Sequence, residues 1–421
     1  MPTLYENPVV PYDYKQWASN HVWLHKQPFP LWLITISYYL FGVSELATRI
    51  PSILFSTFSV YLTYLIGKRF FNKKTGLLAA WFHATNGLII ELVAGRIATD
   101  HYDTMFLILI ELGVWFIIRF QDRKKPAYLI LSAICIAAAI LTKWLPALII
   151  YPIWYLFTKN EQSNGVITGV KQKISNFFLH LFLVVLFAGS WQVYILKSYP
   201  KEAHWEYYHQ FLHMVTTLDK QTGGFFYFFN RLFVSYNELI FLILGFACYK
   251  IIKRQQIHFV YASLLVWILL PVLFFSFLPT KMQGYILFVA PAVFILSADY
   301  FFKLKEMPGN KRQLRLYALL QFCIIVLPLR YTIERMKFFE SYERSRVWVE
   351  ELKGIRINHK ADSTVLFNFP YPIEAMFYTG FTAYESLPDS VQIENIKARG
   401  YTVLVYSNKK NQRNQQKFKK F

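Results

Sequence analysis

A basic pair beside two prolines is the first group of residues that could do chemistry. His25 and Lys26 stand just before Pro28 and Pro30, and a short apolar run follows to about Leu40. Proline fits the first turn of a helix, where its missing N–H costs nothing, so we expect a helix to begin near Pro30. An ammonium group at the mouth of an apolar helix suits the binding of a phosphate at a membrane surface. The alternative is a lysine that reaches back to the interface beside tryptophan anchors.

A second group of charged residues lies where two apolar runs meet. It holds two carboxylates, an arginine and a histidine, namely Arg96, Asp100, His101 and Asp103. A carboxylate at such a place could accept a proton from a hydroxyl or amine nucleophile, or hold a cation or a sugar. The equally weighted alternative is capping, because Asp103 directly precedes the apolar run from Thr104 and favours a helix N-terminus.

Two further loops contain candidate ligands. In the segment 276–285, Lys281 precedes Tyr285 by four residues, so both could face one side of a helix and clamp a phosphate. Snorkelling anchors would give the same pattern. In the segment 201–211, glutamates and histidines are dense enough to suggest a divalent metal, the one candidate cofactor. For that segment we favour an amphipathic interfacial helix with aromatic anchors.

The composition indicates a membrane protein with several spans. Hydrophobic residues make up 55% of the 421 residues and aromatic residues 19%, which is more apolar surface than a soluble domain covers. The formal net charge is +20, yet the basic residues fall in short loops between apolar runs, which argues against a nucleic-acid-binding face. The three cysteines are far apart within apolar runs, so we expect neither a disulfide framework nor a metal cluster.

The apolar runs predict about ten transmembrane helices. Their approximate bounds are Ile50–Ile66, Leu77–Gly95, Thr104–Ile118, Ala127–Leu141, Trp144–Phe157, Asn176–Ile195, Asn237–Tyr249, Phe259–Phe277, Tyr285–Phe302 and Leu316–Tyr331. A lysine in mid-span is costly, so we expect a helix break at Lys143. Loops rich in lysine and arginine alternate strictly with the others, and the positive-inside rule places them in the cytoplasm. The segments 1–49, 95–103, 197–236 and 278–284, Lys143 and everything after Tyr331 then lie on the outer face.

We therefore expect an all-α polytopic membrane protein with a small C-terminal α/β domain. Its parts would be an outer loop with a juxtamembrane helix (1–49), a multi-span domain (50–333), the α/β domain on the outer side (334–408) and a basic, disordered tail (409–421). The run Pro30–Leu40 is too short for a span, hence its assignment to the surface. In the small domain, Thr364–Phe369 and Thr402–Tyr406 read as strands and Ile373–Tyr378 as a short helix.

Six short motifs follow one another along the residues from about 23 to 291. They are His25-Lys26-Gln27-Pro28, Glu45 to Ser52, Gly67 to Phe71, Arg96 to Asp103, Leu141-Thr142-Lys143, and Ser276 to Pro291. In this order they resemble the motifs of the bacterial branch of the dolichyl-phosphate-mannose protein mannosyltransferase superfamily, which includes the lipid A aminoarabinose transferases. Gln27 departs from the His-Lys-Pro-Pro of that group. The resemblance implies a C-type (GT-C) glycosyltransferase that uses a polyprenyl-phosphate sugar.

The resemblance also implies roles for individual residues. It assigns contacts with the lipid-linked phosphate to His25, Lys26, Arg96, Lys281 and Tyr285. Asp103, with Asp100 as the second choice, matches the outer-loop aspartate that follows in the family. The principal catalytic aspartate of the family lies after a first span and upstream of the lysine motif, a position that would precede Met1. We therefore expect a chain that begins after its first helix and first catalytic loop and whose transfer activity is impaired.

The expected function is transfer of a sugar from a polyprenyl-phosphate donor to a lipid, glycan or protein acceptor. The reaction would take place on the periplasmic face of a bacterial inner membrane, with membrane lipids but no nucleic acid among the partners. A carboxylate would activate the acceptor while lysines stabilise the departing phosphate. A transporter or lipid flippase is the alternative, and it predicts ionisable groups near mid-membrane and internal repeats. A non-catalytic scaffold that presents the α/β domain is a third reading, which direct donor binding would exclude.

Overall fold

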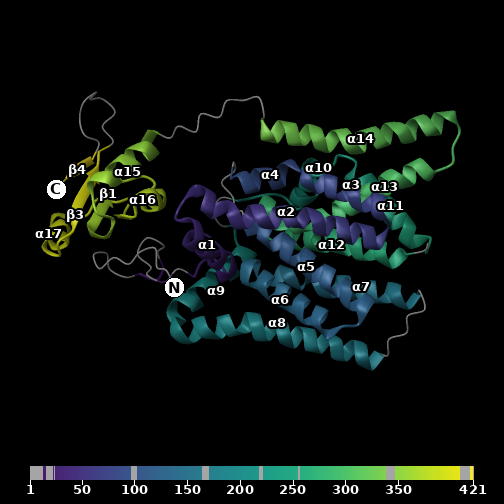
Figure 1. Cartoon of the computed structure of the whole chain (residues 1–421), viewed down its shortest axis with the longest axis horizontal. Coiled ribbons are helices and arrows are strands. Elements are labelled where there is room, and N and C mark those ends of the chain that lie inside the picture. The colour runs from purple at the N-terminus through teal and green to yellow at the C-terminus, as the bar shows by residue number, and fades with distance from the viewer. Residues whose placement is uncertain are drawn as a thin grey trace. The chain divides into compact units, whose positions relative to one another are not determined.

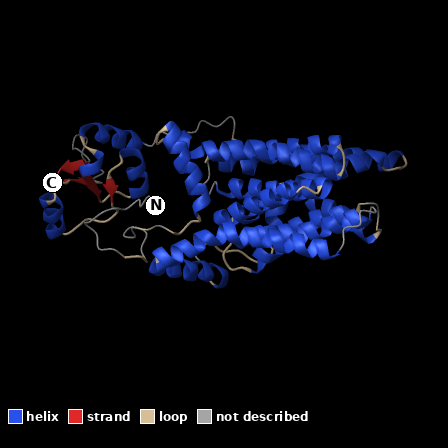
Figure 2. Cartoon of the chain, turned by 60° about the horizontal axis from the view of Figure 1, so that its bottom comes forward, coloured by secondary structure: helices blue, strands red, loops and turns tan. Residues whose placement is uncertain are grey.

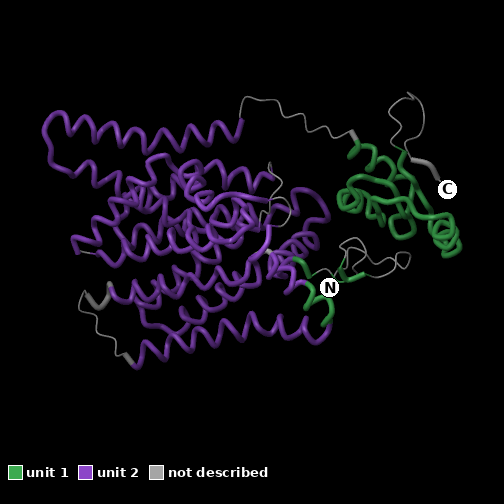
Figure 3. Tube along the Cα trace, turned by 180° about the vertical axis from the view of Figure 1, so that it is seen from behind, with its two compact units in different colours: residues 1–25, 199–205, 339–421 green, residues 26–198, 206–338 purple. Residues whose placement is uncertain are grey.

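The computed structural model describes residues 13–15, 22, 24–95, 102–163, 170–217, 221–254, 257–337, 347–407 and 418–420. The chain divides into two compact units, shown in separate colours in Figure 3. The larger unit holds residues 26–198 and 206–338, and the smaller one holds 1–25, 199–205 and 339–421. Each is described on its own below.

The larger unit is a bundle in which many long helices run roughly parallel (Figures 1 and 2). Its elements are α1 (Pro28–Phe41), α2 (Glu45–Phe70), α3 (Lys73–Ala84), α4 (Gly87–Ala94), α5 (Tyr102–Arg123), α6 (Pro126–Lys143), η1 (Leu145–Ile149), α7 (Ile150–Ser163), α8 (Val170–Ser198), α10 (Tyr227–Ser235), α11 (Ile240–Ile252), α12 (His258–Phe277), η2 (Gln283–Val289), α13 (Ala290–Glu306) and α14 (Lys311–Met336). Helix α9 (Pro200–Val215) is divided between the two units.

The length and composition of these helices fit a membrane protein. Among the described residues, six helices are long and apolar enough to cross a membrane, or up to eight if each bent pair of helices counts as one span. The predicted all-α membrane class with a small α/β appendage is therefore confirmed. The short helix expected near Pro30 is α1, which begins at Pro28, because both prolines fit a first helical turn.

Two pairs of helices are bent at short breaks, and only the first pair corresponds to a single predicted span, Leu77–Gly95. Helices α3 and α4 meet at 46°, where the Asn86 side chain accepts a hydrogen bond from the Ile89 N–H and starts a new helix. Helices α10 and α11 meet at 101°. The break predicted at Lys143 is present, since α6 ends there and Trp144 follows with a φ of 65°. Such a backbone angle is unusual for a residue with a side chain and stops the helix.

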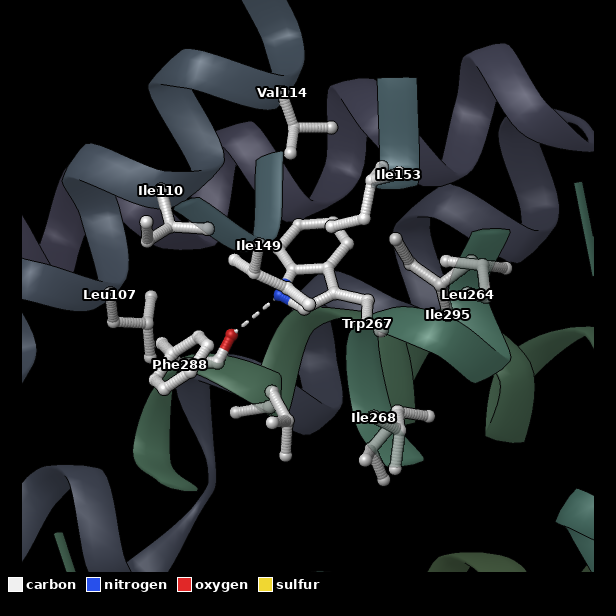
Figure 4. Packing of buried hydrophobic residues seen from close by; sticks show 14 of the residues in the cluster. Leu107, Ile110, Val114, Ile149, Ile153, Leu264, Trp267, Ile268, Phe288 and Ile295 are labelled. Carbon is white, nitrogen blue, oxygen red and sulfur yellow. Dashed lines mark hydrogen bonds between the residues drawn. The ribbon is translucent and has the colours of Figure 1, made fainter. Parts of the chain in front are cut away.

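The core of the bundle is packed around Trp267 of α12 (Figure 4). The indole is fully buried, and its N–H donates a hydrogen bond to the Phe288 carbonyl at 2.9 Å. The Phe288 ring in turn packs edge-on against Phe106 of α5 at 5.0 Å. A buried indole has one donor to satisfy, and here that donor ties α12 to η2. This fixes η2, the segment that carries three residues of the site described below.

A buried polar network joins α2, α3 and α5 inside the bundle. Glu111 accepts hydrogen bonds from Ser59 and, at 2.6 Å, from Thr63. The Thr63 hydroxyl oxygen also lies 2.7 Å from Nδ1 of His83, and all four side chains are buried. Because the hydroxyl has one hydrogen and gives it to Glu111, the His83 Nδ1–H must donate to Thr63. Both carboxylate oxygens of Glu111 thus accept hydrogen bonds from α2.

The smaller unit contains a four-stranded sheet with the order β2-β1-β3-β4. The strands β1 (Thr364–Phe367), β2 (Thr382–Ala383) and β3 (Thr402–Tyr406) are parallel, and β4 (Phe418–Lys420) is antiparallel to β3. The other elements are α15 (Val347–Asn358), η3 (Ala361–Ser363), α16 (Pro372–Thr379) and α17 (Ser390–Ala398). Alternate β1 residues face different clusters, Leu366 with Leu352 of α15 and Val365 with Ile396 of α17, so helices cover both faces.

Two features of this unit differ from the sequence prediction. Both predicted strands and the short helix are present within two residues of the expected bounds, but α15, β2 and α17 were not anticipated. The tail 409–421 was expected to be disordered, and this is wrong for Phe418–Lys420, which forms β4. The edge of β3 offers unpaired backbone groups, and pairing with them orders even a basic segment.

Candidate functional site

An ion pair between α5 and α6 is the centre of the candidate site. Asp103, in the first turn of α5, pairs with Lys143, the last residue of α6. The Asp103 side chain is only 3% exposed, while Lys143 is 23% exposed. The buried carboxylate therefore has its charge compensated by a cation that still reaches the surface of the bundle.

The first residues of η2 close around this pair. The Lys143 ammonium lies 5.0 Å from the centre of the Tyr285 ring, a cation–π distance. Gly284 packs so closely on Asp103 that a β-carbon at this position would overlap the carboxylate. The structure thus brings together Asp103, Lys143 and Tyr285, and the absence of a side chain at Gly284 is what makes the approach possible.

A second ion pair lies on the other side of the same turn and was missed by the sequence prediction. Arg335, near the end of α14, pairs with Glu91 of α4 at 3.0 Å and donates a hydrogen bond to Gln283 at 3.2 Å. Gln283 also donates to the Ser235 hydroxyl at 3.2 Å. Because Gln283 and Gly284 are adjacent, the two ion pairs flank one short segment. A charged residue inside an apolar run is the signal that could have identified Glu91.

Lys281 occupies a different environment from the one predicted. Its side chain is 4% exposed, and its ammonium donates hydrogen bonds to the carbonyl oxygens of Phe275 at 2.9 Å and Ser276 at 2.7 Å. These carbonyls belong to the last turn of α12, so Lys281 caps that helix. Burial lowers the pKa of the Lys281 ammonium. The expectation that Lys281 and Tyr285 share one helix face is wrong, because Lys281 precedes η2.

The basic motif at the start of α1 is held against α8. Gln27 precedes the helix, and its side-chain oxygen accepts a hydrogen bond from Gln192 of α8 at 3.1 Å. Gln192 in turn accepts one from the Tyr207 hydroxyl at 2.6 Å. Burial raises the pKa of Tyr207. His25 and Lys26 are both half-buried. The roles predicted for His25, Lys26, Lys281, Tyr285 and Asp103 remain predictions.

Arg49, the arginine of the motif Glu45 to Ser52, lies over the turn at Gly95. Arg49 of α2 donates a hydrogen bond to the Val93 carbonyl at 3.2 Å, in the last turn of α4. Its guanidinium covers Gly95, which has a φ of 64° and leaves no room for a β-carbon. Arg49 therefore compensates the negative end of α4. The candidates Arg96 and Asp100 lie outside the described residues.

The loop considered as a metal site forms the helix α9. In this helix the ring nitrogen Nδ1 of His204 donates to the Pro200 carbonyl at 2.5 Å, within the same turn. In the part of the chain that the structure describes, no group of three or more His, Cys, Asp or Glu side chains could hold a metal ion. The three cysteines are free. The helix that we favoured for this loop is present as α9, and its position at the membrane interface stays a prediction.

Known proteins resemble this chain in sequence. Residues 25–193 match the family described as dolichyl-phosphate-mannose-protein mannosyltransferase. The undecaprenyl phosphate-alpha-4-amino-4-deoxy-L-arabinose arabinosyl transferase 1 of Pseudomonas fluorescens is 24% identical over 283 residues, which are 65% of this chain and 49% of that protein. The chain spans about half the length of the curated relatives it matches.

Solved structures show the same fold. ArnT from Cupriavidus metallidurans in the apo state has a TM-score of 0.65 at 14% identity, over 92% of this chain and 83% of that one. The archaeal oligosaccharyltransferase AglB from Archaeoglobus fulgidus has a TM-score of 0.55 at 12% identity, over 95% and 63%. In sequence and in fold, the chain resembles the C-type (GT-C) membrane glycosyltransferases of the dolichyl-phosphate-mannose-protein mannosyltransferase group, as its motifs predicted.

Proposed function

We propose that the protein transfers a sugar from a polyprenyl-phosphate donor to a lipid, glycan or protein acceptor at the outer face of a bacterial inner membrane. The observation that carries the proposal is the Asp103–Lys143 pair, closed by Tyr285 and Gly284. Two likenesses support the donor class. The P. fluorescens relative is named for an undecaprenyl-phosphate-linked sugar, and an ArnT structure contains undecaprenyl phosphate.

The proposed chemistry is an inverting displacement at the anomeric carbon. The acceptor oxygen or nitrogen forms a bond to that carbon as the carbon–oxygen bond to the phosphate breaks. The bonding electrons leave with the polyprenyl phosphate, which gains one negative charge, and the acceptor proton passes to Asp103. Protonation of Asp103 neutralises the counter-ion of Lys143, so this ammonium becomes available when the phosphate charge develops. Lys26 and Tyr285 would contact the same phosphate.

A release assay tests this proposal whatever the sugar is. The protein is reconstituted in liposomes with undecaprenyl-phosphate-linked mannose, glucose or 4-amino-4-deoxyarabinose together with a lipid, glycan or protein acceptor, and released undecaprenyl phosphate is measured. Lys143→Gln should lower the rate on the order of a hundredfold, the usual effect of removing one donor to a developing anion. Lys303→Gln is the matched control, because the Lys303 side chain is 38% exposed and forms its ion pair with Glu306, three residues further along the same helix. Equal rates for the two variants would refute the assigned role.

One observation favours the second candidate, a transporter or lipid flippase. Glu111 and His83 are ionisable residues inside the bundle, the kind of position that transport sites use. Against this, both oxygens of Glu111 accept hydrogen bonds from side chains of α2. Movement of a fluorescent polyprenyl-phosphate sugar across the bilayer, without release of polyprenyl phosphate, would favour the transporter over the transferase.

A further inference from the structure

A chain of side chains connects the two lysines that the proposed function assigns to the phosphate. It begins at Gln27, directly after Lys26, and ends at Trp144, directly after Lys143. The links between are the amide of Gln192 and the phenol of Tyr207, which come from α8 and α9. Two cations that contact one phosphate must keep a fixed separation, and this chain joins the segments that carry them.

The hydrogen bonds of this chain have a fixed direction. The Tyr207 hydroxyl donates to Oε1 of Gln192 at 2.6 Å, so the NH₂ group of the same amide is left to face Gln27. It donates to Oε1 of Gln27 at 3.1 Å. Gln192 therefore uses its acceptor on one side and its donor on the other. Gln27 is 9% exposed, so its side-chain oxygen depends on a protein partner.

The other end of the chain is an aromatic contact. The Tyr207 ring packs edge-on against Trp144 at 5.5 Å. Trp144 has the positive φ of 65° that ends α6 directly after Lys143. The ring contact therefore restrains the residue that follows Lys143 and forms this backbone turn. Near the Gln27 end, the edge-on contact of Trp32 in α1 with Trp191 in α8, at 5.5 Å, holds the same two helices together.

We propose that Gln27, Gln192 and Tyr207 are positioning residues that hold Lys26 and Lys143 at the separation needed to bind one lipid-linked phosphate. The inference rests on the proposed function, because it takes the donor phosphate as the shared ligand of the two lysines. None of the three residues is assigned to touch the substrate. Their loss should therefore weaken phosphate binding while leaving the fold intact.

We call the connected side chains of Gln27, Gln192 and Tyr207 the relay. Binding of undecaprenyl phosphate to the purified full-length protein in nanodiscs tests it. Tyr207→Phe removes the hydroxyl and keeps the ring on Trp144, and Gln192→Leu removes the amide. Each should raise the Kd about tenfold, the order expected for one hydrogen bond. The double variant should show the same tenfold increase, because both changes break one connected chain. Tyr249→Phe is the matched control, since Tyr249 is 50% exposed on α11 and should leave the Kd unchanged.

The outcomes separate the relay from the proposed function. An increase of about a hundredfold in the double variant would mean two independent effects and overturn the relay. An unchanged Kd with a lowered melting temperature would show a purely structural role and overturn it as well. Release of undecaprenyl phosphate is measured separately on the unaltered protein. If nothing is released while the variants still lose binding together, the proposed function fails and the relay stands. Absence of binding by the unaltered protein overturns the relay.

Discussion

The close approach of η2 to Asp103 makes Gly284→Ala the most direct test of the site. The backbone of Gly284 needs no special φ, so alanine introduces a steric change alone. Its β-carbon would overlap the Asp103 carboxylate. The carboxylate must then rotate away from Lys143, or η2 must move, and η2 is fixed from behind by the hydrogen bond from Trp267 to Phe288. We therefore expect the Asp103 side chain to rotate away and its ion pair with Lys143 to be disrupted.

The size of the effect follows from overpacking and from the lost pair. One methyl group forced into a packed site costs about 1 to 3 kcal/mol in the free energy of unfolding. If transfer depends on the Asp103–Lys143 pair, the release rate should fall on the order of a hundredfold. Both quantities can be measured on one preparation, with unfolding followed by denaturant titration in detergent and the rate by released undecaprenyl phosphate.

Gly245→Ala provides a matched control. Gly245 lies in α11, and a β-carbon there would have no atom within 4 Å outside its own helix backbone and chain neighbours. Alanine at a helical position should leave the rate unchanged and add up to about 1 kcal/mol of stability. If Gly284→Ala behaves like Gly245→Ala in both measurements, the tight contact with Asp103 does not exist or does not matter, and the reasoning about the site is refuted.

Three other substitutions test the bundle. Lys143→Gln should destabilise the fold by about 1 to 3 kcal/mol, because it removes the cation that compensates the buried Asp103 charge. In a double-mutant cycle measured by denaturant unfolding, Lys143→Gln combined with Asp103→Asn should destabilise the fold by less than the sum of the two single variants. Glu111→Leu should lower the free energy of unfolding by about 1 to 2 kcal/mol. Glu111→Gln should lower it by about half as much, because the amide oxygen still accepts a hydrogen bond; equal destabilisation by the two variants would contradict the hydrogen-bond assignment. Trp267→Phe should cost about 2 kcal/mol through the smaller ring and the unpaired Phe288 carbonyl, and an unchanged unfolding midpoint would contradict the packing in Figure 4.

The positions of the helices could be predicted from the sequence because hydropathy acts locally. A run of apolar residues predicts a membrane-spanning helix directly. A lysine such as Lys143 predicts a helix end, because a charge in the middle of a span is costly. The bend between α3 and α4 could not be predicted in this way. The bend depends on whether Asn86 caps the N-terminus of a separate helix or lies inside one continuous helix, and tertiary packing decides between these two structures.

The partners within the site depend on the fold as a whole. Asp103 and Lys143 were each placed at the outer face from the sequence, but nothing local predicts that they pair. Glu91 and Arg335 lie far apart in the chain and meet only because α4 and α14 pack together. Lys281 shows the opposite failure, since a four-residue spacing from Tyr285 predicts a shared helix face only where a helix exists.

The Glu111 network has a consequence for biosynthesis. An ionised side chain at the centre of a membrane helix raises the free energy of insertion by about 3 kcal/mol when no partner is present. Among the described residues, the partners in this network, Ser59 and Thr63 directly and His83 through Thr63, precede Glu111 in the chain and belong to α2 and α3. When α5 leaves the ribosome, the helices whose side chains hydrogen-bond to Glu111 or to its partner Thr63 have already been synthesised. The order of residues along the chain thus provides hydrogen-bond partners for Glu111 before α5 is inserted.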